Sequence, residues 1–283
     1  MGDAVPRGST NGGQRTVGDA PRRGRPEEQQ PHSSSWLRGP WIWRSMGPAE
    51  RKARGHAYRR RRFHLFVRLV DGVLARRETC RILDVGGDPD YWTTLADLLG
   101  ERRYHVTLVN RTAYEVDETR FSSMAGDARD LGAFADMRFD IVHSNSVIEH
   151  VGRFGDMQAM AREVRRLAPS YFVQTPYFWF PIEPHCATAF FHWMPEPIQV
   201  SMLMRRPRGD WGQAPNIATA LRQIRSVALL DRRTLATLFP DAAIRRERIL
   251  GLTKSLIAIR DLTGRPVPTA RERRAPSGDR PSV

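Results

Sequence analysis

A glycine-rich turn with two acidic residues follows a short apolar run within residues 82–92. A helical pattern begins directly after the turn, which is how an α/β fold places a nucleotide-like ligand at the carboxyl end of a parallel strand. A dinucleotide would bring its pyrophosphate to the N-terminus of that helix, where Asp88 and Asp90 would repel it. The two carboxylates would instead attract a ligand that carries a sulfonium and an ammonium group.

Three further segments place polar residues where predicted strands end. They are residues 109–111, 126–131 and 139–151. Together with the glycine-rich turn, these four motifs occur in the order that is typical of class I S-adenosylmethionine-dependent methyltransferases. The chain resembles that family over about residues 80–260.

The resemblance implies S-adenosylmethionine as cofactor and a set of residues that bind it. Gly86 matches the family's first glycine, where the backbone approaches the donor. Asn110 stands in place of the acid that usually accepts hydrogen bonds from both ribose hydroxyls, and it can offer one acceptor and one donor. Asp127 corresponds to a carboxylate near the adenine amino group. The full predicted donor site comprises Asp84, Gly86, Gly87, Asp88, Asn110, Asp127, Ala128, Ser144 and Asn145.

Each motif also has a structural interpretation without a ligand. The turn after residue 85 could simply join a strand to a helix, and Asn110 could be a loop residue that tolerates a turn conformation. Either Asp127 or Asp130 could cap the next helix. Glu149 and His150 are interpreted as residues that organise their loop rather than as catalytic groups.

An aromatic segment follows the fifth predicted strand. Residues 171–193 contain nine of the 25 aromatic residues of the chain and three prolines, which suits neither a regular strand nor a helix. We expect a wall that excludes water from a methyl-transfer site; ordinary packing against the sheet edge is the alternative. Within it we predict His185 as general base, because imidazole titrates near neutral pH, and Glu183 as its orienting partner. No metal-ligand constellation stands out.

Strand and helix patterns alternate along the body of the chain. This alternation predicts an α/β, Rossmann-like, doubly wound fold with a mainly parallel seven-stranded sheet and helices on both faces. Two consecutive strands at the end favour a hairpin that adds an antiparallel strand. The predicted strands are 81–85, 105–109, 121–125, 139–144, 170–174, 243–250 and 255–260, and the predicted helices are 49–77, 91–99, 157–167, 217–230 and 233–238, with an irregular stretch before residue 217.

The positive charge of the chain is concentrated at its ends. The formal net charge of the 283 residues is +14, of which residues 1–62 contribute +9 and residues 265–283 contribute +3. Few large apolar side chains occur in residues 1–35, so this segment is predicted to be disordered. We predict a disordered or irregular tail over 1–48, a methyltransferase domain over 49–264 and a disordered tail over 265–283.

Cysteine content and hydropathy favour a cytoplasmic protein. Cys80 and Cys186 are the only cysteines, which is too few for a disulfide framework. No apolar run is long enough to span a membrane, and the N-terminal residues lack the apolar region of a signal peptide.

These observations predict an enzyme that transfers a methyl group from S-adenosylmethionine to an oxygen or nitrogen of a small-molecule or envelope-precursor acceptor. Catalysis would come mainly from alignment and desolvation. One alternative is a donor-binding protein of the same fold without turnover, suggested by Asp88, Asp90 and Asn110. A nucleic-acid methyltransferase that uses the basic tails is another, but Ser146 follows Asn145 where a proline would be expected, which disfavours nucleic acid as a partner. The acidic turn disfavours a nicotinamide-dependent oxidoreductase.

Overall fold

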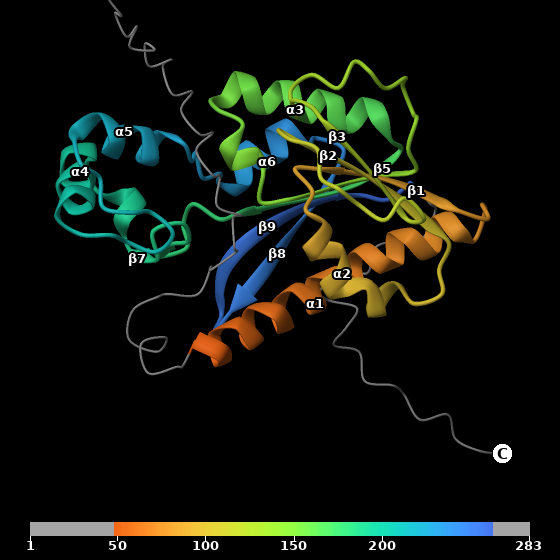
Figure 1. Ribbon diagram of the computed structural model, residues 1–283, viewed down its shortest axis with the longest axis horizontal. Coiled ribbons are helices and arrows are strands. Elements are labelled where there is room, and N and C mark those ends of the chain that lie inside the picture. The colour runs from red at the N-terminus through yellow and green to blue at the C-terminus, as the bar shows by residue number, and fades with distance from the viewer. Residues whose placement is uncertain (1–47, 263–283) are drawn as a thin grey trace, which may run out of the picture. The chain divides into compact units, whose positions relative to one another are not determined.

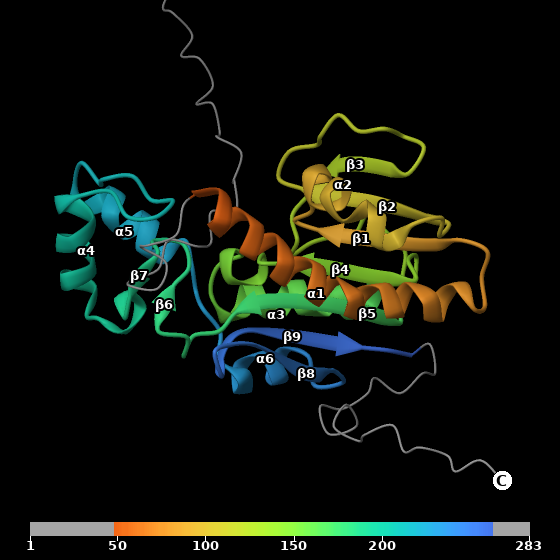
Figure 2. The ribbon, with the colours of Figure 1, turned by 90° about the horizontal axis from the view of Figure 1, so that it is seen from below.

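A computed structural model describes residues 48–262, with side chains from residue 58 onward. At its centre lies a seven-stranded sheet in the order β3-β2-β1-β4-β5-β9-β8 (Figure 1 and Figure 2). The first five strands in this order are parallel to one another, whereas β9 is antiparallel to both β5 and β8. The predicted Rossmann-like sheet and its closing hairpin are therefore confirmed. The strands are β1 (Cys80–Val85), β2 (Tyr104–Asn110), β3 (Phe121–Ala125), β4 (Ile141–Asn145), β5 (Ser170–Pro176), β8 (Ala243–Ile249) and β9 (Leu252–Arg260).

Helices cover both faces of the sheet (Figure 1). On one face lie α1 (Pro48–Leu74) and α2 (Pro89–Leu99), and on the other lie α3 (Phe154–Leu167) and α6 (Arg232–Leu238). No helix within residues 48–262 combines the length and the apolar character that a membrane span requires. The predicted terminal tails lie outside the described residues apart from Pro48, so the proposed domain boundaries stay predictions.

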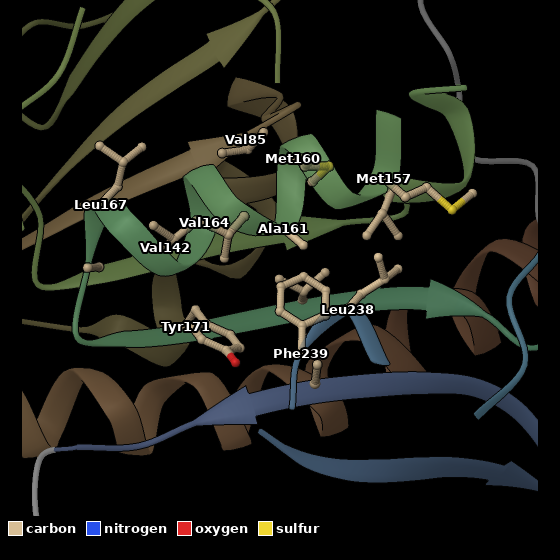
Figure 3. Close-up of a cluster of buried hydrophobic side chains, with 14 of the residues drawn as sticks. Val85, Val142, Met157, Met160, Ala161, Val164, Leu167, Tyr171, Leu238 and Phe239 are labelled. Carbon is tan, nitrogen blue, oxygen red and sulfur yellow. The ribbon is translucent and has the colours of Figure 1, made fainter. Parts of the chain in front are cut away.

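The two apolar cores follow from the alternation of side chains along each strand. In β1, Ile82 packs under α1 and α2, whereas Leu83 and Val85 pack under α3 and α6. Figure 3 shows the core under α3 and α6. Met160 and Val164 of α3 face the sheet in it, and Phe239, the residue after α6, packs into the same cluster. Continuous apolar strands that are buried on both faces are what a mainly parallel sheet requires.

A long insert, residues 177–231, separates β5 from α6. It contains β6 (Ile182–Glu183), β7 (Thr188–Ala189), the 3-10 helix η2 (Phe191–Trp193), α4 (Glu196–Arg205) and α5 (Ile217–Arg225). The insert has its own small core, and Figure 2 shows its elements gathered beyond the carboxyl ends of the parallel strands. In the structure, therefore, much of the stretch expected to be irregular is ordered.

The predicted helix over 217–230 is too long at its C-terminal end. The helix α5 stops at Arg225 because the backbone beyond it bonds to other elements. The N–H of Ala228 donates to the carbonyl of Glu149 at 2.8 Å, and the carbonyl of Leu230 accepts from the N–H of Phe178 at 2.9 Å. These bonds attach the end of the insert to the loop after β4 and to the end of β5.

We expect Phe66→Ala to lower the free energy of unfolding by about 3–5 kcal/mol, because it leaves a cavity in a packed core. The Phe66 side chain is fully buried, and its ring centroid lies 5.0 Å from that of His143 and 5.6 Å from that of Trp92. Urea unfolding measures the loss. The matched control is Phe154→Ala, whose side chain is 44% exposed, and an equal loss in both variants would contradict this account of the core.

Candidate functional site

A buried polar network lies beneath the turn after β1. The two carboxyl oxygens of Asp84 are both engaged: Oδ2 accepts from Trp92 Nε1 at 2.6 Å, and Oδ1 accepts from His143 Nδ1 at 2.7 Å. His143 Nε2 lies 3.4 Å from the hydroxyl of Tyr91, which is positioned to donate to it. Burial raises the pKa of Tyr91, so the phenol keeps its proton. These contacts join β1, β4 and α2 to one another inside the protein, with Asp84 at their centre.

The glycines of the turn are required by close packing. Gly86 has φ +76°, a conformation that side chains rarely adopt, and a Cβ there would collide with the methyl groups of Val147. A Cβ at Gly87 would lie 2.5 Å from Asp84 Oδ2. Asp88 is the N-cap of α2, because its side chain accepts from the N–H of Asp90 at 2.8 Å. The turn is therefore packed against Val147 and against the Asp84 carboxyl group beneath it.

Asn110, at the end of β2, holds this turn. Its Nδ2 donates to the carbonyl of Gly87 at 3.0 Å and lies 3.2 Å from the hydroxyl of Tyr114. Its Oδ1 accepts from the N–H of Arg111 at 2.8 Å. The amide is thus engaged locally on both sides, and a ligand hydroxyl would share or replace one of these bonds.

The Asp127 carboxylate lies at the same sheet edge, after β3. Its side chain accepts from Arg129, with the shortest distance 2.6 Å, and Arg129 also binds Asp156 at 3.0 Å. The hydrogen bonds and charge of Arg129 lower the pKa of Asp127, so the group is an ionised acceptor. No helix follows for Asp127 or Asp130 to cap; each instead accepts a backbone N–H within its own loop. Ala128 packs its methyl group against the core.

The end of β4 supplies two more of the predicted donor-site residues. Ser144 is buried and its Oγ donates to the carbonyl of Val85 at 3.1 Å, which ties β4 to the glycine-rich turn. Asn145 is different, because its Oδ1 is buried and has no hydrogen-bond partner within residues 48–262. A buried acceptor of this kind is unfavourable unless a ligand or water satisfies it.

A second polar cluster joins the insert to the loop after β4. His185 Nδ1 lies 2.7 Å from Glu183 Oε1, and His185 Nε2 lies 3.0 Å from His150 Nε2. His150 belongs to the 3-10 helix η1 (Ile148–His150), as does the fully buried Glu149. The structure thus brings His185 and Glu183 together, as predicted, and adds Glu149 and His150 to them.

The charge states of this cluster follow from its contacts. Burial would lower the pKa of His185, but the hydrogen bond and charge of Glu183 outweigh it and raise that pKa. Burial would raise the pKa of Glu183. Its hydrogen bonds with His185 and with the N–H of Cys186 outweigh burial and lower that pKa. Burial raises the pKa of Glu149 to about 7.

Sequence reasoning missed the partners that hold the predicted residues. Trp92 and His143 hold Asp84, and Arg129 holds Asp127. A usable signal existed for His143, because a histidine within an otherwise apolar strand is buried and must find a polar partner. Neither Trp92 nor Arg129 differs in its local pattern from an ordinary core or surface residue.

We expect Trp92→Phe to destabilise the protein by about 1–3 kcal/mol, because it leaves Asp84 Oδ2 buried without its donor. Thermal and urea unfolding measure the change. Trp179→Phe is the matched control, since the Trp179 side chain is 58% exposed. If both substitutions have the same small effect, the indole N–H of Trp92 does not support the turn.

Comparison with known proteins bears on this site. Residues 77–170 match the family model described as a methyltransferase domain, and a search of curated proteins finds no match. Among solved structures, the CurJ carbon methyltransferase is 11% identical over 65% of this chain, with a TM-score of 0.39, and the chain spans about half of its length, 49%. A SAM-dependent methyltransferase from Aquifex aeolicus is 11% identical over 67% of this chain and 87% of its own, with a TM-score of 0.35.

A third structure is the 1,6-didemethyltoxoflavin-N1-methyltransferase of Burkholderia thailandensis, solved with S-adenosylhomocysteine. It is 13% identical over 68% of this chain and 74% of its own, with a TM-score of 0.40. The family match covers β1 to the start of β5, where the four sequence motifs lie. Residues 77–170 are therefore similar to a methyltransferase domain, and this part of the chain contains the four motifs in the same order as the sequence analysis gave them.

Proposed function

We propose that the protein transfers a methyl group from S-adenosylmethionine to an oxygen or nitrogen of a small-molecule or envelope-precursor acceptor. One observation carries this proposal: the titratable cluster of the insert contacts the same loop that continues from the predicted donor site. Asn145 ends β4, and His150, five residues later, lies 3.0 Å from His185 of the insert. The donor would therefore lie on one side of η1, near Asn145, and the acceptor on the other side, near His185.

The donor is proposed to lie along the ends of β1, β2, β3 and β4. Its adenine amino group would donate to the Asp127 carboxylate, in competition with Arg129. Its ribose would lie near Asn110, and its ammonium group would donate to the unsatisfied Oδ1 of Asn145. The backbone of Gly86 and Gly87 would contact the donor, while Asp84 supports the turn from within through its bonds to Trp92 and His143.

The acceptor is proposed to lie under the insert. In the transfer, a lone pair of the acceptor attacks the methyl carbon, the carbon–sulfur bond breaks, and its electron pair stays on sulfur as S-adenosylhomocysteine forms. The acceptor also loses one proton, which His185 would accept. Glu183 fixes the tautomer of His185 by accepting from its Nδ1, which makes Nε2 the basic atom. A raised pKa makes that imidazole a better proton acceptor.

We expect Asp127→Ala to weaken the binding of S-adenosylhomocysteine by about 1–3 kcal/mol, the scale of a lost hydrogen bond to a charged group. Calorimetry measures the affinity. The matched control is Asp130→Ala, because Asp130 lies on the same loop and accepts only the N–H of Gly132 among the bonds of its side chain that the structure describes. Equal affinity in wild type and in the Asp127 variant would remove Asp127 from the donor site.

For catalysis, we expect His185→Ala to lower turnover by about 10²–10⁴, the usual effect of losing a general base, with donor affinity nearly unchanged. Transfer of a labelled methyl group to a panel of candidate acceptors measures it. His64→Ala, an exposed histidine on α1, is the control. Donor binding without any methyl transfer across the panel would instead favour the non-catalytic donor-binding protein.

A further inference from the structure

Hydrogen bonds fix the protonation pattern of the two facing histidines. His150 Nδ1 lies 3.1 Å from the backbone carbonyl of Ser226, and a carbonyl can only accept, so the proton is on Nδ1. His185 Nδ1 lies 2.7 Å from Glu183 Oε1, and the other oxygen of this carboxyl group accepts the N–H of Cys186 at 2.6 Å, so the Glu183 carboxylate also accepts from His185. In both neutral rings Nε2 therefore carries a lone pair and no proton.

Those two lone pairs face each other. The Nε2 atoms of His150 and His185 are 3.0 Å apart, and their rings are perpendicular, with centroids 4.7 Å apart. Two acceptor nitrogens at this distance repel unless a cation lies between or beside them. That cation is either a proton, which makes one ring an imidazolium, or a metal ion bound by both nitrogens.

The carboxyl group of Glu149 distinguishes a shared proton from a metal ion, because it places a third polar atom beside the two nitrogens. Its side chain is fully buried; Oε2 accepts from Thr175 Oγ1 at 3.0 Å, whereas Oε1 is buried with no hydrogen-bond partner within residues 48–262. One atom each from Glu149, His150 and His185 lie within 4.8 Å of one another. A shared proton satisfies the two nitrogens and leaves Oε1 without a partner, whereas a metal ion satisfies all three atoms.

We propose that Glu149, His150 and His185 bind a divalent transition-metal ion, with zinc as the best match. Two imidazole nitrogens and one carboxylate oxygen form a three-ligand set that zinc adopts in catalytic sites, with a fourth position left open. Zinc–nitrogen bonds of about 2.0–2.1 Å at a tetrahedral angle place two nitrogens about 3.3 Å apart, close to the spacing in this cluster. Magnesium and calcium prefer all-oxygen ligands, which this cluster does not offer.

The outer contacts also suit a metal site. A ligating histidine commonly donates its other N–H to a carboxylate or a backbone carbonyl, which fixes the ring and its tautomer. Glu183 does this for His185, and the carbonyl of Ser226 does it for His150. The Glu183 carboxylate is itself held by the N–H of Cys186 at 2.6 Å. Both rings are therefore oriented before any ion binds.

The position of the metal site suggests a role in activating the acceptor, an argument that rests on the proposed function. The exposed ring of His150 leaves the cluster accessible from solvent. An acceptor hydroxyl that binds the open position would lose its proton to water more readily, because the ion stabilises the resulting oxyanion. That oxygen would then attack the methyl carbon as described above. The inference thus favours hydroxyl-bearing acceptors: with the ion bound, His185 is a ligand and water takes the proton, whereas His185 is the base only in the metal-free protein.

Metal binding can be tested without donor or acceptor. The full chain, without a histidine tag, is freed of metal with a chelator and titrated calorimetrically with zinc chloride. We expect one zinc ion per chain. Glu149→Gln and His150→Ala should each weaken binding at least tenfold, and Glu183→Gln should weaken it about 10–100-fold through the orientation of His185. Titration with cobalt(II) should give visible absorption bands of a nitrogen-ligated ion that are absent in the His150 variant.

The matched control is His192→Ala, because His192 lies in the same insert but its Nε2 lies 2.6 Å from the carbonyl of Phe178. An unchanged circular dichroism spectrum and an unchanged urea-unfolding midpoint verify that each variant is folded. No saturable zinc binding by wild type, or equal affinity in wild type and the His150 variant, overturns the inference and leaves a shared proton between the histidines. Either result is independent of whether an acceptor is methylated, so failure of the proposed function is seen separately.

Discussion

The hydrogen bonds of the buried Asp84 carboxyl group are the interaction on which the turn after β1, and with it the proposed donor site, depends. The carboxyl group lies on the α1 and α2 face of the sheet, where only a polar partner can stabilise it, and Trp92 and His143 supply two donors. Those partners come from α2 and β4, so the group fixes α2 and the central strands β1 and β4 relative to one another. Gly87 has no side chain because the carboxyl group occupies that space.

Hydrogen bonds of the loop after β4 connect the proposed donor site to the insert. The loop after β4 contains η1, whose Glu149 binds Thr175 of β5 through its side chain and Ala228 through its carbonyl. The His150 side chain contacts both Ser226 and His185 of the insert. One short helical turn therefore anchors the insert over the carboxyl ends of the strands. A change in the position of the insert would be transmitted directly to the loop that is proposed to hold the donor.

The two sides differ in how their polar groups are satisfied. Beneath the turn, Asp84, Trp92, His143 and Ser144 bond to one another or to backbone, which suits a rigid support. In the proposed site, by contrast, two buried oxygens, Asn145 Oδ1 and Glu149 Oε1, have no hydrogen-bond partner in the described part of the chain. Unsatisfied buried oxygens are unfavourable in a folded protein and are typical of positions that a ligand completes. They mark where the donor and the metal ion are proposed to bind.

Local sequence was sufficient for the fold and for placing the predicted donor-site residues at one edge of the sheet. Apolar runs with period two and amphipathic segments with helical period define the strands and helices, and polar residues at strand ends of a parallel sheet converge at one edge. The same local patterns did not reveal α4 or the end of α5, because proline and aromatic density obscures helical periodicity and because α5 stops where backbone groups bond to Glu149 and Phe178.

Tertiary structure alone decided which residues act together. The sequence favoured His185 and Glu183 as a pair, since they are two residues apart, and treated Glu149 and His150 as a separate loop with no metal constellation in view. His150 and His185 are 35 residues apart, and only the folding of the insert over η1 brings their Nε2 atoms within 3.0 Å. Long-range contacts of this kind carry no local periodicity. The motifs and their spacing indicated the class of chemistry, whereas the packing of the insert determined the geometry of the proposed acceptor side.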